Sequence, residues 1–176
     1  MLVKKLLMII ILSSPALVYA QTCKLTSIPS STPSNQFTDN HNGTVKDNKT
    51  GLIWKKCSEG QVWNNATGRC NGNATTYTWQ DALKQAQTVN NSSGFAGYAD
   101  WHLPNITELE SIVERQCYDP AINLTIFPDT PSSSDYWSSS PRANVSYNAW
   151  GISFDSGGGG WANKNSSVNV RLVRGE

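Results

Sequence analysis

The sequence contains 176 residues, of which only 15% are charged, and its 14 lysines and arginines nearly balance its 13 aspartates and glutamates. Because the formal charge is only +1, a broad basic surface for nucleic-acid phosphates is not expected. No stretch approaches the roughly 20 consecutive apolar residues of a membrane-spanning helix, so we expect no membrane span.

The first segment, residues 1–20, has the features of a secretory signal peptide. Lys4 and Lys5 precede an apolar run from Leu6 to Leu12, and small residues lead to Ala20. This order is typical of a signal that is cleaved, here after Ala20. Without Lys4 and Lys5, twelve basic residues face thirteen acidic ones, a formal charge close to minus one. We therefore expect an exported protein, in the periplasm, at the cell surface or outside the cell.

The basic side chains are unevenly distributed, since most lie in the first half and the stretch from Asp100 to Asp135 is acidic. The basic residues of the first half are Lys24, Lys46, Lys49, Lys55, Lys56, Arg69 and Lys84. Two interpretations stay open: a patch that meets a sulfated or acidic surface, or ordinary solvated strands, which is the more common case.

All four cysteines follow the signal segment, and an even number in an exported protein indicates two disulfides, for which three pairings exist. We prefer Cys57 with Cys70, because the turn-rich segment between them closes a short loop worth roughly 3 kcal/mol in the chain-entropy model. Cys23 then pairs with Cys117. A metal site is the competing interpretation, but there is no CxxC spacing and no clustered histidine, so we expect no metal.

The part before the domain, residues 21–35, is a Ser/Thr/Pro-rich arm that is expected to be extended and to bury little. A single domain, residues 36–176, follows. We expect it to begin with an antiparallel meander, because short apolar runs around Phe37, Val45 and Trp54 are separated by Asn-Gly and Thr-Gly turn signals.

The stretch from Asp39 to Asp47 offers oxygen ligands around a glycine, so we compared it with calcium-binding loops. The glutamate that closes an EF-hand is missing, and Thr50 stands at its place. The Glu-Pro-Asn signature of calcium-dependent lectins is also absent, since Leu103 precedes Pro104 and Asn105. The sequence therefore predicts a hairpin turn, and glycan binding without calcium.

Two helices are predicted in the middle of the chain. Thr78 caps the first, whose apolar face consists of Trp79, Ala82, Leu83 and Ala86. Asn105 caps the second, with Glu108 reaching back in a capping box, and its apolar stripe consists of Ile106, Leu109, Ile112 and Val113. Glu110 and Glu114 are expected on the solvated side of this helix rather than as a pair of catalytic carboxylates.

The last third alternates strands with polar loops. DYWSSS, NAWGISF and VNVRLVRG are predicted strands. Loops anchored on strands commonly carry binding residues. The candidate ligand-binding residues in these loops are Arg142, Tyr147, Asn148, Trp161, Asn163 and Lys164. Strands, two helices and strands again, without an internal repeat, indicate an α+β fold.

Several spaced motifs, in a fixed order, resemble one family. They are NGTVKDNKTGLIWKKCSEGQVW, YTWQDALKQA, GYADWHLPNITELESIV, IFPDTPSSSDYWSSS and VRLVRG. In this order they resemble the bacterial extracellular domains named after the C-terminal domain of the Legionella collagen-like adhesin, from Phe37 to Gly175. The resemblance implies a C-type-lectin-like fold, in the variant shared with formylglycine-generating enzymes: two helices on a small twisted antiparallel sheet with long C-terminal loops. It also implies binding of sulfated glycosaminoglycans and assembly into trimers as properties of the adhesin's domain.

The chain departs from that family and from those enzymes in specific positions. His102 stands where the family usually has arginine, and no collagen-like Gly-X-Y tract precedes the domain. Formylglycine-generating enzymes bind copper through a late pair of cysteines, but no cysteine follows Cys117. No nucleophile motif accompanies His102 either, so we expect a structural corner residue, no enzyme activity and no cofactor.

Seven tryptophans in a small polar domain exceed the needs of one modest core. Packing is expected for Trp54, Trp79, Trp101, Trp137 and Trp150. Trp161, after four glycines in a flexible loop, is expected to contact a ligand or partner. The favoured function is recognition of a glycan or cell-surface polymer in adhesion. The alternative is a protein-binding module with a variable lectin-like face, and an oxidoreductase of the formylglycine-generating type comes third and is disfavoured.

Overall fold

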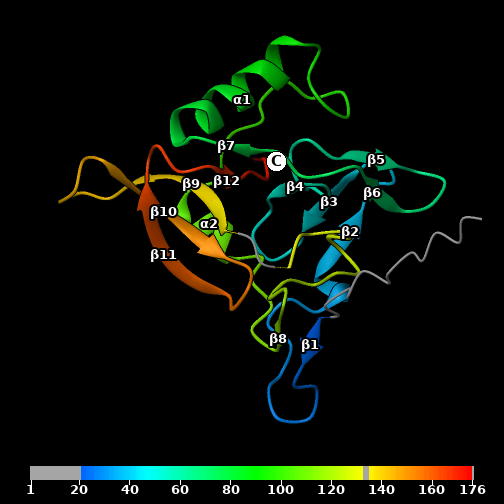
Figure 1. The fold of residues 1–176 in the computed structure, drawn as a ribbon. Coiled ribbons are helices and arrows are strands. Elements are labelled where there is room, and N and C mark those ends of the chain that lie inside the picture. The colour runs from blue at the N-terminus through cyan, green and yellow to red at the C-terminus, as the bar shows by residue number, and fades with distance from the viewer. Residues whose placement is uncertain (1–20, 133–134, 176) are drawn as a thin grey trace, which may run out of the picture.

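The computed structural model describes residues 21–132 and 135–175, so the expected signal peptide lies outside the described residues. Within these residues the chain forms two α-helices and thirteen short strands, an α+β arrangement with mostly antiparallel sheets (Figure 1). The helices are α1 (Trp79–Asn91) and α2 (Ile106–Glu110), and Ser34–Gln36 forms a 3-10 turn. The strands are β1 (Thr22–Cys23), β2 (Phe37–Asp39), β3 (Thr44–Asp47), β4 (Ile53–Lys55), β5 (Val62–Asn64), β6 (Arg69–Asn71), β7 (Thr76–Tyr77), β8 (Cys117–Tyr118), β9 (Asp135–Pro141), β10 (Asn148–Ser153), β11 (Gly158–Asn163), β12 (Val168–Asn169) and β13 (Val173–Arg174).

Two sheets make up the body of the fold. The five-stranded sheet has the order β11-β10-β9-β12-β7, and the four-stranded sheet has the order β13-β4-β3-β2. All of these pairings are antiparallel except that of β12 with β9. The predicted strand VNVRLVRG supplies β12 to one sheet and β13 to the other, so this single segment joins them (Figure 1).

The meander predicted near the start of the domain is confirmed. β2, β3 and β4 follow one another as antiparallel neighbours, with Val45 opposite Trp54. The turn between β2 and β3 is a hairpin, as predicted, in which the Asn42 side chain accepts from the backbone N of Thr44. Trp54 is fully buried and anchors the sheet in the core.

Both predicted helix starts are confirmed. The Thr78 hydroxyl accepts from the backbone N of Asp81, and Asn105 and Glu108 form the reciprocal capping box. The second helix is shorter than predicted, because α2 ends at Glu110. Ile112 and Val113 are buried as expected, but they lie beyond the helix, where Val113 forms an isolated bridge with Ile122.

The prediction for Glu114 is wrong, because its side chain is buried rather than solvated. Only 3% of the residue is exposed, and its carboxylate accepts from Ser30 Oγ and from the backbone N and side chain of Ser31 and Thr32. Burial raises the pKa of Glu114, but these hydrogen bonds and one from the backbone N of Gln116 outweigh it and hold the pKa at about 2. The arm around Thr32 therefore packs against the domain, contrary to the expectation that it buries little.

Both disulfides have the predicted pairing. Cys57 is bonded to Cys70, and Cys23 is bonded to Cys117. The first fixes the β5–β6 hairpin to the end of β4, and the second fixes the arm to β8. The two bonds thus secure the segments that contribute least to the sheets.

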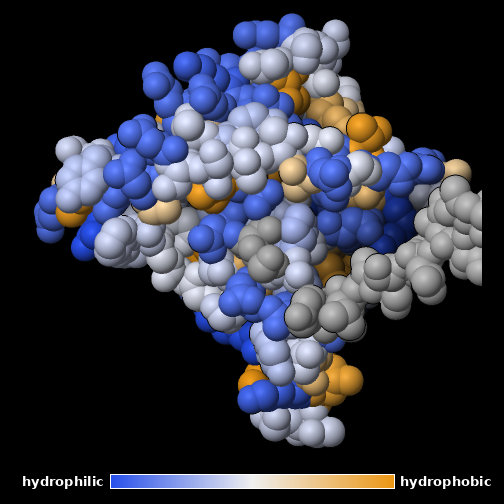
Figure 2. Space-filling view, viewed as in Figure 1, coloured by the Kyte–Doolittle hydropathy of each residue, from blue (hydrophilic) through white to orange (hydrophobic). Residues whose placement is uncertain are grey.

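Two clusters of apolar side chains form the core, and β9 separates them. Tyr136 and Ile152 belong to the cluster that includes Leu109 of α2, whereas Trp137 and Ala149 belong to the cluster that includes α1. Because successive strand residues point to opposite faces, α1 and α2 cover opposite faces of the five-stranded sheet. The outer surface in Figure 2 is largely hydrophilic, with small separate apolar spots.

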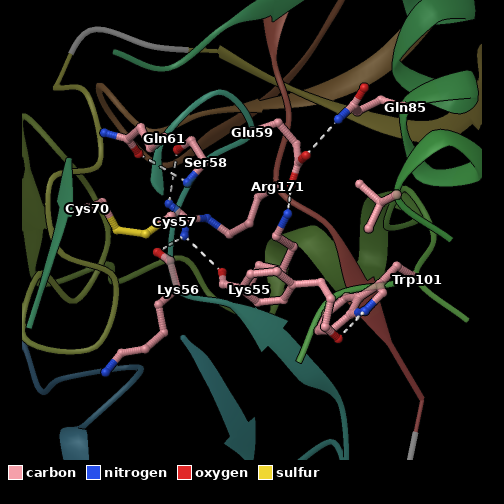
Figure 3. A network of polar contacts seen from close by, with 12 residues as sticks. Lys55, Lys56, Cys57, Ser58, Glu59, Gln61, Cys70, Gln85, Trp101 and Arg171 are labelled. Atoms are coloured by element: carbon pink, nitrogen blue, oxygen red, sulfur yellow. Dashed lines mark hydrogen bonds and ion pairs between the residues drawn. A yellow bond between two sulfur atoms is a disulfide. The ribbon is translucent and has the colours of Figure 1, made fainter. Parts of the chain in front are cut away.

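A buried polar network connects the two sheets to α1 (Figure 3). Arg171 is fully buried, and its guanidinium donates to the carbonyls of Lys55 and Lys56 and to Thr130 Oγ1. Lys55 Nζ donates to Glu59, whose other carboxylate oxygen accepts from Gln85 of α1 at 2.9 Å. Lys56 Nζ donates to Asp39 Oδ2 at 2.8 Å. Lys55 and Lys56 are therefore buried and paired, and neither interpretation of the basic half, an exposed patch or solvated strands, holds for these two lysines.

Candidate ligand-binding site

A cleft of about 560 Å³ lies between the start of α1 and the loops that follow β9 and β11. Its lining residues are Thr78, Trp79, Gln80, Leu83, Tyr147, Asn163, Lys164 and Asn165. A volume of this size falls within the roughly 300–1,000 Å³ of small-molecule sites. Three of the predicted binding residues, Tyr147, Asn163 and Lys164, meet here with residues from a helix distant in the sequence.

Trp79 forms the fixed wall of the cleft. It is the first residue of α1, and its backbone N donates to the carbonyl of Lys164 at 2.9 Å. Its indole Nε1 donates to the carbonyl of Ser138 in β9 at 2.8 Å. Both N–H donors of Trp79 are therefore satisfied by backbone carbonyls, which fixes the ring while leaving part of it accessible.

Lys164 lies beside Trp79 and is held by three contacts. Its backbone N donates to the carbonyl of Tyr147 at 2.8 Å, and its Nζ donates to the carbonyl of Ser146 at 2.7 Å. The same Nζ lies over the Trp79 ring, 4.3 Å from the centroid. An ammonium group has three N–H donors. One is used by Ser146, so others remain for a ligand.

The charge and polarity of the cleft favour an uncharged or anionic ligand rich in hydrogen-bonding groups. Among the described residues that line it, Lys164 carries the only charge. Asn163, Asn165 and Gln80 are exposed and offer amide donors and acceptors. One of these groups is preorganised, because Asn163 Oδ1 accepts from the backbone N of Asn165 at 2.9 Å.

Tyr147 supplies an exposed aromatic face at the mouth of the cleft. It is 64% exposed, a high value for a large apolar side chain. The loop that carries it is closed by backbone hydrogen bonds from Val145 to Arg142 and from Asn148 to Val145. The ring is therefore displayed by a short, internally bonded loop, as the sequence analysis expected of residues in this segment.

Arg142 and Trp161 form a separate pair outside the cleft. The Arg142 guanidinium stacks over the Trp161 ring, 4.5 Å from the centroid, and Trp161 is 55% exposed. Trp161 does not lie in a flexible loop, which corrects the prediction. It belongs to β11, directly opposite Trp150 of β10, because the glycines before it pair regularly with β10.

Asn148 is also placed differently from the prediction. It is the first residue of β10 and only 3% exposed. Its backbone carbonyl accepts from the backbone N of Arg142, which closes the loop between the two strands. Asn148 therefore shapes the loop that presents Tyr147 and does not offer its own amide to a ligand.

The residues that α1 contributes to the cleft were not among the predicted binding residues. Helical periodicity assigned Trp79 and Leu83 to the packed face of α1, and both are indeed partly buried. No local signal shows that the edge of this face borders a loop more than sixty residues later in the chain. The Trp79–Lys164 contact is the kind of long-range pairing that only the fold provides.

His102 is a hydrogen-bonded corner residue, as predicted. Its backbone N and carbonyl pair with Val173, and its imidazole Nε2 lies 3.4 Å from the carboxylate oxygens of Glu108. Glu108 also accepts from the backbone N of Asn105 in the capping box. His102 is not among the residues that line the cleft.

The sequence profile of one family, described as the Lcl C-terminal domain, matches residues 43–174, which is most of the chain. The chain belongs to the Lcl C-terminal domain family. The matched region of this Lcl C-terminal domain contains both helices, the meander from β3 onwards and every residue that lines the cleft. A comparison with curated proteins finds no significant match. In the part of the domain that the structure describes, no helix is long and apolar enough to cross a membrane.

Proposed function

We propose that the protein is an exported recognition domain that binds a glycan or surface polymer in adhesion, without catalysing a reaction. The cleft between α1 and the β9–β10 and β11–β12 loops is the proposed site. The observation that carries this proposal is the arrangement of Lys164, held over Trp79, beside the exposed ring of Tyr147. Family membership supports an adhesin-related extracellular role.

The chemistry of the cleft suits a sugar. Aromatic rings stack on the apolar faces of sugar rings, and Tyr147 offers such a face at the mouth of the cleft. The amides of Asn163, Asn165 and Gln80 match hydroxyl groups, which both donate and accept. Lys164 adds a cation for a sulfate or carboxylate group, so a sulfated glycosaminoglycan is the favoured polymer.

We further propose that the fold is the C-type-lectin-like variant suggested by the sequence motifs. Two helices on opposite faces of a small sheet, with ligand-presenting loops after β9 and β11, support this assignment. Binding is proposed to be independent of calcium. Within residues 21–132 and 135–175, no group of three or more His, Cys, Asp or Glu side chains is arranged to hold a metal ion.

The test is retention of the exported protein, residues 21–176, on a heparin column, together with a glycan array. We expect retention that falls with added salt, because exposed ionic contacts are screened. Lys164→Ala and Tyr147→Ala should each reduce it. Lys49→Ala and Tyr118→Ala, which change exposed residues outside the cleft, are the matched controls.

Absence of any glycan signal would contradict the proposal and shift weight to the protein-binding alternative. Equal loss in the cleft variants and the control variants would show a nonspecific charge effect, and would remove the cleft as the site. Measurable turnover of a bound compound would contradict the non-catalytic part of the proposal.

A further inference from the structure

A second, smaller cavity lies on the five-stranded sheet beside the cleft. It encloses about 70 Å³ and is lined by residues of β9, β10 and β11 together with Val168. Small-molecule sites usually measure roughly 300–1,000 Å³. The cavity is therefore too small for a whole sugar ring and fits a single substituent.

The strand register explains why a cavity exists at this point. Gly151 of β10 lies opposite Trp137 of β9 on one side and opposite Gly160 of β11 on the other. Residues directly opposite each other point to the same face of a sheet. This is the same face that α1 covers further along the sheet. Gly151 and Gly160 are adjacent on it and have no side chains, so they form the floor of the cavity, next to Trp137.

The fold requires glycine at only one of these two positions. A Cβ on Gly151 would lie 2.4 Å from the carbonyl O of Tyr136, so the packing of β9 requires glycine at this position. A Cβ on Gly160 would meet nothing within 4 Å, and the backbone of Gly160 does not have a positive φ. The fold thus does not require glycine at position 160, where a side chain would enter the open space of the cavity. Glycine inside a strand often marks the close approach of a ligand.

The chemistry of the cavity is apolar at its sides and acidic at one end. Val168 is buried and Ala162 is partly buried, so the walls are hydrocarbon, and they pack with Trp137, whose indole is almost fully buried. Asp135 and Ser153 lie opposite each other at the end of the same face. A carboxylate repels sulfate and carboxylate groups, but it accepts readily from an N–H donor. The matching substituent is small and uncharged, with an apolar end and an N–H group.

The cavity and the cleft are adjacent along one strand. Ala162 of β11 lines the cavity, and the next residue, Asn163, lines the cleft. Successive strand residues are about 3.3 Å apart. Ala162 packs on the face of the sheet that α1 covers, and Trp79 and Leu83 of α1 line the cleft, so the cavity and the cleft lie on the same face and a polymer in the cleft can extend to the cavity.

We propose that the cavity receives the N-acetyl group of an N-acetylated amino sugar, with the methyl group against Ala162 and Val168 and the amide N–H toward Asp135. This inference rests on the proposed glycan-binding function and names the sugar class that the site selects. Two parts of the surface then have different roles. Lys164 binds the anionic groups of a polymer, and the cavity above Gly151 and Gly160 binds its acetamido groups.

The test follows the methyl NMR signals of Ala162 and Val168 while the exported protein is titrated with N-acetylglucosamine or with glucose. The two sugars differ at one carbon, which carries the acetamido group in the first and a hydroxyl in the second. We expect saturable shifts with N-acetylglucosamine and none with glucose. Gly160→Ala should weaken the response by about tenfold, the order of effect of one methylene-sized change in an apolar pocket, and Gly160→Val should abolish it.

Gly159→Ala is the matched control, because it adds the same methyl group to the opposite face of β11, in ordinary contact with Ile152 at 3.8 Å. Its response should equal that of the unaltered protein. Equal shifts with both sugars, or unchanged N-acetylglucosamine binding in the Gly160 variants, would overturn the inference even if heparin retention depends on Lys164. If the protein binds neither heparin nor any arrayed glycan and shows no shift, both the proposed function and this inference are contradicted.

Discussion

The ammonium group of Lys164 lies 4.3 Å from the centroid of the Trp79 ring, and the two residues are also joined by a backbone hydrogen bond of 2.9 Å. One comes from the first turn of α1 and the other from the loop after β11. This double contact fixes the position of Lys164, the only charged residue among the described residues that line the cleft. The orientation of the cation is therefore settled by the fold before any ligand arrives.

Lys164→Ala is expected to weaken heparin binding by about 2- to 5-fold at low salt and to change binding little at high salt, because an exposed ionic contact is worth at most about 1 kcal/mol and is screened as salt increases. Isothermal titration at two salt concentrations measures this difference. Lys164→Arg should keep much of the affinity, since the charge and the stacking on Trp79 are retained. A loss that is independent of salt would show that Lys164 acts by shaping the loop rather than through its charge.

Tyr147→Ala is expected to reduce glycan affinity by about 2- to 12-fold, the equivalent of 0.5–1.5 kcal/mol for an aromatic contact. Tyr147→Phe keeps the ring and should stay close to the unaltered protein. Because Tyr147 is 64% exposed, neither change should shift the thermal midpoint appreciably. Identical affinities for the alanine and phenylalanine variants would argue against stacking on this ring.

Glu114 is expected to make the free energy of unfolding depend on pH in the acidic range. Its pKa in the folded protein is about 2, below the ordinary value of 4.5. The ionised carboxylate therefore contributes stability that is fully present above pH 4.5 and is lost as the pH falls towards 2, by about 3 kcal/mol in total. Urea unfolding at a series of pH values between neutral and strongly acidic measures this loss.

Glu114→Gln should lower the stability at neutral pH and flatten its decline in acid. Glu110→Gln is the matched control, because Glu110 is about half exposed and pairs with Arg115 at the surface. A pH profile that is the same for both variants would show that the hydrogen bonds from the arm do not depend on the charge of Glu114.

Arg171→Met is expected to destabilise the protein by about 3 kcal/mol or more, because it leaves the carbonyls of Lys55 and Lys56 buried without their donor. Chemical denaturation gives the difference. Arg115→Met removes an exposed arginine and should cost little. Equal stability of the two variants would mean that water or local rearrangement replaces the guanidinium.

Local signals in the sequence predicted the elements that depend on local contacts. Thr78 and Asn105 act as helix caps through residues three positions later, so the helix starts follow from the sequence directly. The hairpin after β2 and the short disulfide loop from Cys57 to Cys70 are similarly local. In each case the partners are close in the chain, and few alternative arrangements compete.

The features that sequence analysis missed depend on distant partners. Glu114 has the spacing of a solvated helix residue, yet its hydrogen-bond partners lie in an arm more than eighty residues earlier. Trp161 follows glycines that indicate a loop, but pairing with β10 makes that segment a strand. The cleft itself needs Trp79 beside Lys164. No local pattern contains these relationships, because tertiary packing overrides local preference.

The segment from Val168 to Arg174 crosses from one sheet to the other, with Arg171 buried between them. Val168 pairs with Tyr77, and Val173 pairs with Trp54. Neither hydrophobic cluster can close until this segment has been synthesised, long after its partners. The two sheets and both clusters therefore form one cooperative unit, whose completion waits for β12 and β13.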